Sequence, residues 1–341
     1  MRPAIFAASL SLFFTSILLA QSPQRLADYL TQNPDADTNG DGVLSIEEAK
    51  AHRGMKRNPT TGDNLAARSV IPGAKVSLTD SPIEEVALRS EDGVDLSFVW
   101  RKPAGDGPFP AIIFLHGGGN TASMQDLRTS VRSEPVQTRF LENGYLIAAS
   151  TRRPFWKSRG KDRPFGFDEA VQDTKLILEK IRTLPEVDPN KITLYGGSGG
   201  GILAIGTAAV DNEVAAVIAG EPATVIPLDP RSKTGEITGS RDYEALMQDP
   251  LPLYTAERRE ETRAWMNKIE CPVLILQGKP VLLYKVNFEI LIPEMKALGK
   301  DISSITYPGM VHGFYWGKTK TGATLETVEK VVDDSLRFLA R

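Results

Sequence analysis

Cysteine and excess positive charge are what this 341-residue sequence lacks most clearly. Cys271 is the single cysteine, so no disulfide can form within the chain, and a large hydrophobic core must stabilise the fold. Lysine and arginine number 40 against 43 aspartate and glutamate residues, a formal net charge of −3. Proteins that bind nucleic acids usually carry a basic excess, so we expect no nucleic-acid partner.

The first 20 residues have the composition of a targeting segment. Arg2 precedes an apolar run from residue 4 to residue 19 that contains no charge, and the small residue Ala20 follows it. This pattern predicts a secretory signal peptide, residues 1–20, and therefore export to the periplasm or the cell exterior, with no membrane span in the mature chain. An uncleaved membrane anchor is the alternative, although the run is short for a span and lacks a basic stop on its far side.

Residues 23–56 form a small polar unit around the stretch DTNGDGVLSIEE, residues 37–48. This stretch matches an EF-hand calcium loop at all twelve positions, with Gly42 at the position of the sharp turn. The predicted Ca²⁺ ligands are Asp37, Asn39, Asp41, the carbonyl of Val43, Ser45 and Glu48. A plain Asp/Asn/Gly turn is the alternative. Because EF-hands usually occur in pairs, a single loop suggests dimerisation or docking on another surface.

Residues 57–75 are punctuated by proline, glycine and asparagine and are predicted to be a linker. From residue 76 to residue 341, apolar runs alternate with helical patterns, after a predicted hairpin that turns at Asp92 and Gly93. Strand-length runs are found at residues 110–116, 145–151, 191–197, 214–220, 271–278 and 303–309, with helical patterns at 167–184, 199–210, 256–268, 285–298 and 323–340. The alternation predicts an α/β domain, a mostly parallel sheet with helices on both faces.

Two glycine-rich turns follow predicted strands. Residues 196–200, GGSGG, place Ser198 between a strand and a helix, which is the setting of a G-x-S-x-G nucleophile elbow. A phosphate-binding loop does not fit, because no Gly-Lys-Ser/Thr follows. The second turn, residues 116–119, reads HGGG, and the N–H groups of Gly118 and Gly119, together with that of Gly199, are predicted to form an oxyanion hole. In each case a simple structural turn is the alternative.

The sequence contains three histidines, so the general base is found nearly by elimination. His52 lies in the polar N-terminal unit, and His116 belongs to the glycine turn. His312 follows the last predicted strand and comes after Ser198 in the chain, as the base does in hydrolases with a nucleophile elbow. A structural histidine is the alternative for this position.

From about Glu84 to Arg341 the chain resembles the α/β-hydrolase superfamily, in particular the prolyl-oligopeptidase-type (peptidase S9-like) catalytic domain and its dienelactone-hydrolase-like relatives. The resemblance is carried by SEDGVDLSFVWRKPAGDGPFPAIIFLHGGG, by FDEAVQDTKLILEKIRTLPEVDPNKITLYGGSGGG and by YPGMVHGFYWG. It implies serine hydrolysis through an acyl-enzyme without a catalytic cofactor. It does not distinguish a small-molecule ester from a short peptide as the substrate. The N-terminal segment is too short for the propeller domain of the peptidases, so we expect an esterase first and a peptidase second.

The acid of these families follows the strand before the histidine, typically as Gly-x-x-Asp. Here that spacing from Gly278 arrives at Val281, and residues 279–288 contain no carboxylate. Glu221 directly follows the run 214–220, at the same predicted sheet edge, and is the favoured substitute. The alternative for Glu221 is a surface or capping role. The site would then be a Ser–His dyad, or an impaired site on a scaffold that serves calcium-dependent binding.

The segment after the run 145–151 is rich in basic residues. Arg152, Arg153 and the nearby Trp156 are predicted to bind substrate, because arginine can hold a carboxylate with two hydrogen bonds. A solvated loop, with Trp156 in the core, is the alternative.

Overall fold

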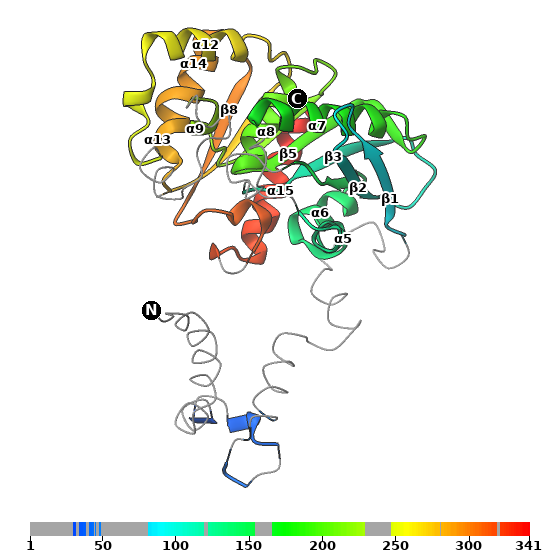
Figure 1. Ribbon diagram of the computed structural model, residues 1–341. Coiled ribbons are helices and arrows are strands. Elements are labelled where there is room, and N and C mark those ends of the chain that lie inside the picture. Colours follow the sequence, from blue (N-terminus) through cyan, green and yellow to red (C-terminus); the bar gives the residue numbers. More distant parts are fainter. Residues whose placement is uncertain are drawn as a thin grey trace, which may run out of the picture. The chain divides into compact units, whose positions relative to one another are not determined.

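The apolar runs of the C-terminal part form one eight-stranded sheet in the computed structural model of the chain (Figure 1). The structure describes residues 30–31, 34–38, 41–43, 45, 48, 81–118, 122–153, 166–228, 247–279, 281–318 and 321–341. The strands are β1 (Glu84–Arg89), β2 (Asp95–Arg101), β3 (Phe109–Leu115), β4 (Leu146–Ser150), β5 (Val187–Gly197), β6 (Ala216–Gly220), β7 (Val273–Lys279) and β8 (Ile302–Pro308).

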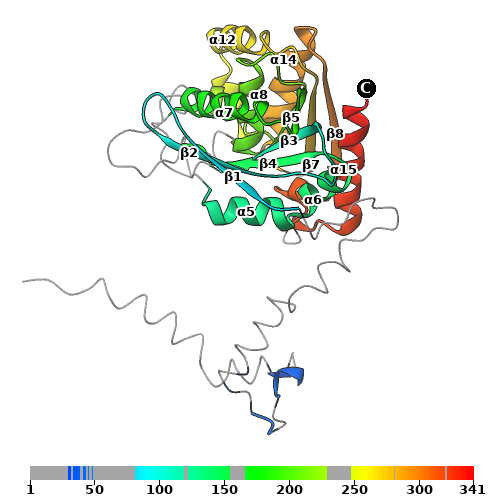
Figure 2. The ribbon, with the colours of Figure 1, turned by 90° about the vertical axis from the view of Figure 1, so that its right-hand side faces the viewer.

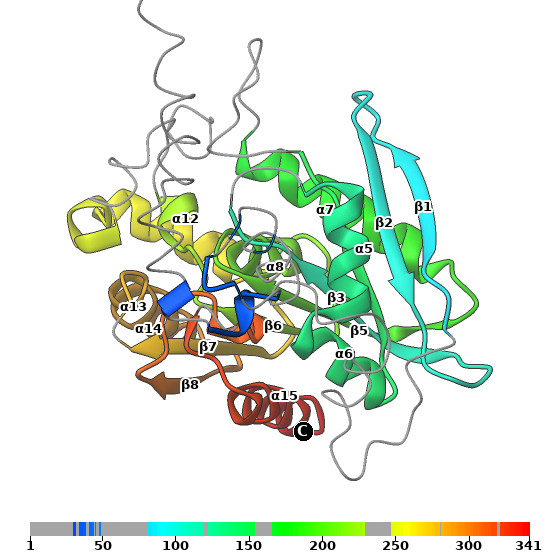
Figure 3. The same ribbon diagram turned by 90° about the horizontal axis from the view of Figure 1, so that it is seen from below.

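The strands are arranged in the order β1-β2-β4-β3-β5-β6-β7-β8, with the β1–β2 hairpin at one end and β8 at the other (Figure 3). The hairpin and the β2–β4 pair are antiparallel, and all pairs from β4 to β8 are parallel. The carboxyl ends of β3 to β8 therefore lie along one edge of the sheet, where ligands of such sheets bind.

Helices cover both faces of the sheet (Figure 2). The helices are α5 (Met124–Ser133), α6 (Pro135–Glu142), α7 (Phe167–Arg182), α8 (Gly199–Ala208), α9 (Val225–Leu228), α12 (Ala256–Met266), α13 (Tyr284–Val286), α14 (Ile292–Ala297) and α15 (Leu325–Leu339). Alternate residues of a strand point to opposite faces. Thus Ile112 and Phe114 pack in the core that contains residues of α5, α6 and α15, whereas Ile113 packs in the core that contains residues of α7, α8 and α14.

The predicted α/β fold is confirmed, and the differences lie in individual elements. Helices α5 and α6 were not predicted, because α5 is short and largely polar, and α6 is short and buries polar residues along with its apolar ones. The segment predicted as one helix over 285–298 is divided into α13, a π-helical turn (Asn287–Leu291) and α14. Pro293, which has no N–H to donate, lies just after this turn and accounts for the interruption.

The chain divides into two units, Met1–Gly73 and Ala74–Arg341. In the first unit, a short 3₁₀ turn (Pro34–Ala36) precedes the predicted calcium loop. The predicted signal peptide, the linker and His52 lie outside the described residues. Among the helices that are described, none combines the length and the apolarity needed to cross a membrane.

Candidate active site

Ser198 occupies a sharp turn between β5 and α8. Its backbone has φ 54° and ψ −118°, a left-handed φ that is rare outside glycine. Its N–H donates to the carbonyl of Gly220 at 2.8 Å, so the turn is fixed to the neighbouring strand. The turn requires glycine at Gly200, because a Cβ there would lie 2.0 Å from the carbonyl oxygen of Leu115. The predicted nucleophile elbow is therefore present in its expected strand–turn–helix setting.

Glu221 and His312 are in direct contact. The imidazole Nδ1 of His312 lies 2.6 Å from Oε2 of Glu221, whose side chain is fully buried. The same carboxylate accepts hydrogen bonds from the N–H of Gly278 to Oε1, at 3.0 Å, and from the N–H of Gly313 to Oε2, at 3.2 Å. Like Ser198, Glu221 has a positive φ, 45°, in the turn that follows β6. The carboxylate missing at Val281 is thus supplied to His312 from the adjacent strand.

Ser198 and His312 line one cavity of about 480 Å³. In an enzyme without bound substrate, the hydrogen bond between the nucleophile and the base is often long, and it commonly shortens only when substrate binds. Aromatic side chains from Phe114, Tyr315 and Trp316 form one part of the wall. Another part of the lining is polar and contains Ser130, Glu134, Gln137, Lys318 and Thr321. Lys318 Nζ and Glu134 Oε1 lie 3.4 Å apart in this part.

The predicted oxyanion turn packs against the nucleophile turn. A Cβ on Gly117 would lie 3.0 Å from the carbonyl oxygen of Gly197 and 3.4 Å from Cβ of Ser198. Gly118 has φ +76° and lines the cavity. Gly199 is the first residue of α8, where N–H groups lack partners within the helix and favour a negative charge. Gly119, also predicted for this role, lies outside the described residues.

Arg152 was predicted to bind substrate, but the structure gives its guanidinium a different position. The side chain is buried, and Nη2 donates to the carbonyl oxygens of Gly118 at 2.6 Å and of His116 at 3.2 Å. His116 Nδ1 lies 2.9 Å from the carbonyl oxygen between them, that of Gly117. Two side chains therefore hold three successive carbonyls of the oxyanion turn. Since C=O and N–H point in opposite directions in a trans peptide, the contact of His116 with the Gly117 carbonyl also fixes where the N–H of Gly118 points.

Burial governs the charge of both side chains that hold this turn. Burial, and then the neighbouring charge of Arg152, lower the pKa of His116 to about 3, so the imidazole is neutral at physiological pH. Burial lowers the pKa of Arg152 to about 9, while the nearby Asp173 raises it. Arg152 therefore remains protonated at pH 7, and a positive charge lies behind the oxyanion turn.

The substrate-binding prediction for Arg153 is also wrong in its physical basis. Its guanidinium is buried and paired with Asp173, Nη2 to Oδ1 at 2.6 Å, and with Asp92, Nη1 to Oδ2 at 2.6 Å. These pairs connect the end of β4 to helix α7 and to the β1–β2 hairpin, so Arg153 stabilises the fold. Trp156, the third predicted substrate contact, lies outside the described residues.

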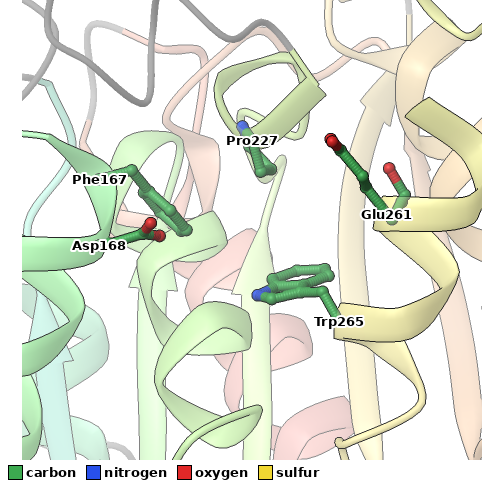
Figure 4. A pocket seen from close by; sticks show the side chains of 6 residues that line it. Phe167, Asp168, Pro227, Glu261 and Trp265 are labelled. Atoms are coloured by element: carbon green, nitrogen blue, oxygen red, sulfur yellow. The ribbon is translucent and has the colours of Figure 1, made fainter. Parts of the chain in front are cut away.

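A second and much smaller cavity, about 30 Å³, lies between α7, α9 and α12 (Figure 4). Asp168 and Glu261 face it from opposite sides, and Trp265 lies below them in this view. Its volume admits little more than a water molecule. Neither Ser198 nor His312 lines it, so it does not belong to the active site.

The predicted calcium loop is described at Asp37, Asp41, Val43, Ser45 and Glu48, while Asn39 lies outside the described residues. Gly42 has φ +77°, and its N–H donates to Asp37 Oδ2 at 2.8 Å. Hydrogen bonds from Ser45 and then Thr38 lower the pKa of Glu48 to about 2. Within the described part of the chain, no three carboxylate, histidine or cysteine side chains are gathered as a metal site. The positive φ of Gly42 matches the sharp turn expected at this position, whereas the described carboxylates are not gathered around a single point.

The donors to Glu221 could not be found from the sequence. They are the backbone N–H groups of Gly278 and Gly313, and almost every residue carries such a group, so the residue type does not indicate which one donates. The role of Arg152 was missed for a related reason, because its acceptors are backbone carbonyls of a distant turn.

Comparison with known proteins agrees with this geometry. The family model "Acetyl xylan esterase (AXE1)" matches residues 151–224, which include Arg152, Ser198 and Glu221. The quorum-quenching protein AidA of Acinetobacter baumannii (strain MDR-ZJ06) is 31% identical over 141 residues, which are 41% of this chain and 44% of AidA. The chain spans about half the length of the curated relatives that it matches.

Solved structures share the fold at low sequence identity. Thermogutta terrifontis esterase 2, solved after phosphoramylation by tabun, matches with a TM-score of 0.52 and 22% identity over 77% of this chain and 96% of the esterase. Brefeldin A esterase, a bacterial homologue of human hormone-sensitive lipase, matches with a TM-score of 0.56 and 18% identity over 94% of this chain and 93% of that esterase. The described residues between 81 and 341 thus have an α/β-hydrolase fold, and the family match supports a hydrolase of the esterase type.

Proposed function

We propose that the chain is a serine hydrolase that cleaves carboxylic esters through an acyl-enzyme. The observation that carries this proposal is the 2.6 Å contact between His312 and the buried Glu221, at the cavity that Ser198 lines. A fully buried carboxylate with two backbone donors and an imidazole has the contacts that an orienting acid requires.

The reaction uses each group in turn. His312 Nδ1–H donates to Glu221, which leaves Nε2 free to take the proton of Ser198 Oγ as this oxygen attacks the ester carbonyl. The N–H groups of Gly118 and Gly199 stabilise the developing oxyanion. His312 then gives the proton to the leaving alcohol, and water attacks the acyl-enzyme by the same sequence of proton transfers.

Esters are favoured over peptides by the match to the acetyl xylan esterase model, which covers Ser198 and Glu221. Short acyl groups are favoured over long alkyl chains, because the lining of the cavity includes the Glu134–Lys318 pair, and burying an alkyl chain against it would desolvate both charges. A serine peptidase with the same three side chains is the second candidate.

Turnover of p-nitrophenyl acetate, p-nitrophenyl octanoate and an aminoacyl anilide separates these functions. We expect the acetyl ester to have the highest kcat/KM, and faster cleavage of the anilide would favour the peptidase. A fluorophosphonate probe should label the wild-type chain and fail to label Ser198→Ala. If the wild-type chain is not labelled, it is a binding protein on an impaired scaffold.

The N-terminal unit is proposed to bind Ca²⁺ through Asp37, Asn39, Asp41, the Val43 carbonyl, Ser45 and Glu48, as a structural ion without a catalytic step. For an extracellular module the dissociation constant is expected on the order of 10⁻⁴–10⁻³ M. Calorimetric titration of the full chain with Ca²⁺ tests the site, with Glu48→Gln as the variant that should lose the heat of binding. Dimerisation or docking through this unit should then appear as a calcium-dependent change in sedimentation.

Export is proposed from the predicted signal peptide. Expression of the full chain, fractionation and N-terminal sequencing should yield a periplasmic or secreted protein that begins near Gln21. A chain that keeps its first 20 residues in the membrane fraction would instead be anchored.

A further inference from the structure

The carboxylate of Glu221 is held by backbone that belongs to a different strand. The N–H of Glu221 donates to the carbonyl of Leu276 at 2.9 Å, as the last bond of the β6–β7 ladder. Its side chain then crosses to Gly278, two residues further along β7. A Cβ on Gly278 would lie 2.7 Å from Oε1 of Glu221, so the carboxylate packs directly on this glycine. Any movement of the end of β7 relative to the turn after β6 would therefore displace the acid.

A chain of buried side-chain hydrogen bonds joins these two segments. Thr224 Oγ1 donates to Asn287 Oδ1 at 2.7 Å, and Asn287 Nδ2 donates to Gln277 Oε1 at 3.0 Å. Gln277 Nε2 in turn donates to the carbonyl of Gly278 at 3.1 Å. Thr224, Gln277 and Asn287 are each 0% exposed, as is Glu221.

The direction of this chain of hydrogen bonds is uniform. Each side chain donates to the next, from the hydroxyl of Thr224 to the carbonyl of Gly278, so every amide has one orientation that satisfies both of its neighbours. Turning the amide of Asn287 over would place its Oδ1 against Oε1 of Gln277, so that two buried acceptors would face each other without a hydrogen between them. Such buried polar networks specify one arrangement of the segments that they connect.

Asn287 lies at the start of the π-helical turn (Asn287–Leu291), between α13 and α14. Single π-helical turns are rare and are found frequently at functional sites. Here the turn brings one side chain between the residues after β6 and the residues at the end of β7. In the pattern of related hydrolases the segment after β7 would carry the acid itself, whereas in this chain Gly278, near the end of β7, carries an N–H that holds the acid.

We propose that Asn287 is a positioning residue for the Glu221–His312 pair, acting through Gln277 and Gly278 on one side and through Thr224 on the other. The proposal rests on the proposed serine-hydrolase function. The side-chain amide of Asn287 is buried and does not contact His312. Its proposed role is to fix the position of the Glu221 carboxylate.

The first test is Asn287→Leu, which keeps a similar volume and removes both hydrogen bonds. Misplacing a catalytic group by about 1 Å can cost roughly 100-fold in rate, so we expect kcat for p-nitrophenyl acetate to fall between about 10-fold and 100-fold, with KM little changed. Titration with a fluorophosphonate probe counts the competent sites, so that kcat is expressed per folded molecule. The matched control is Thr174→Val, which removes a buried hydroxyl that bonds within α7, far from the acid in the sequence, and should leave kcat unchanged.

The second readout is the low-field proton resonance of the Nδ1–H of His312, which reports its hydrogen bond to Glu221 without requiring turnover. It should be present in the wild-type chain and in Thr174→Val, and it should broaden or disappear in Asn287→Leu. If Asn287→Leu does not fold, Thr224→Val at the end of the network should show the same changes to a smaller extent.

The outcomes separate the two proposals. Lower thermal stability in Asn287→Leu, with an unchanged kcat per titrated site and an unchanged resonance, would show that the network serves only the fold and would overturn this inference. A wild-type chain that shows the resonance but neither ester turnover nor labelling would overturn the proposed function instead.

Discussion

Replacing Glu221 by glutamine tests the site most directly, because it removes a charge and one acceptor while keeping the shape of the side chain. In the structure Oε1 accepts from Gly278, and Oε2 accepts from Gly313 and His312. Glutamine has only one oxygen. If that oxygen faces His312, its NH₂ group faces the N–H of Gly278, and if it faces Gly278, the NH₂ group faces the N–H of Gly313 and Nδ1 of His312.

The second orientation forces His312 into the wrong tautomer. Nδ1 would then accept a proton from the glutamine, and Nε2 would carry a hydrogen and could not take the proton of Ser198. In a known triad, replacing the orienting aspartate by asparagine costs about 10⁴-fold in kcat, equivalent to roughly 5 kcal/mol of transition-state stabilisation. We expect a loss of the same order in Glu221→Gln, with KM much less affected.

The assay is kcat for p-nitrophenyl acetate, divided by the fraction of sites that a fluorophosphonate probe titrates. Glu294→Gln is the matched control, because Glu294 is also a glutamate of low exposure, 7%, and is paired with Arg259 and Arg263 away from the cavity. It should lose stability and keep its kcat. A loss smaller than about 10-fold in Glu221→Gln would refute the assignment, since it would fall far below the effect of removing an orienting acid.

Two further predictions concern the oxyanion turn. Arg152→Met should lower kcat by about 10²-fold with little change in KM, as expected for the loss of an oxyanion-hole donor, because the carbonyls of the turn lose their shared partner; an unchanged kcat would contradict this role. The second prediction concerns pH. The unfolded chain protonates His116 below its ordinary pKa of 6.5, whereas the folded chain does so only near 3, so the stability it contributes is lost as pH falls through this window. Urea unfolding of His116→Asn should therefore depend less on pH than wild type, by about 2 kcal/mol between pH 6.5 and pH 5, and equal slopes would refute the burial of a neutral imidazole.

The parts of the site that could be predicted from the sequence are those encoded by local patterns. Ser198 stands between a strand-length apolar run and a helical run, with glycines on both sides, and these neighbours determine the turn. His312 could be assigned because the sequence contains few histidines and because chain order is informative in this fold. The sheet itself follows from the alternation of apolar runs with helical segments.

The parts that could not be predicted depend on contacts between distant segments. Arg153 pairs with Asp92, 61 residues away, and with Asp173, 20 residues away, so a basic loop in the sequence becomes part of an internal ion-pair network. Arg152 is equally basic in the sequence, yet it bonds to backbone carbonyls that lie 34 and 36 residues before it. From the sequence alone, a run of charged residues is interpreted as a solvated loop, because the partners that bury it lie in distant segments.

The position of the acid follows from the geometry of neighbouring parallel strands. β6 and β7 are hydrogen-bonded to each other, with Gly220 opposite Leu276, so the residues that follow each strand emerge side by side at the same sheet edge. An imidazole held above that edge can therefore receive a carboxylate from either strand. In this chain the backbone of Glu221 adopts a positive φ, and its side chain extends toward β7. The N–H of Gly278 donates a hydrogen bond to the carboxylate and so fixes its position. For the proposed hydrolase, the aliphatic Val281 then needs no carboxylate, because Glu221 on the neighbouring strand already contacts His312.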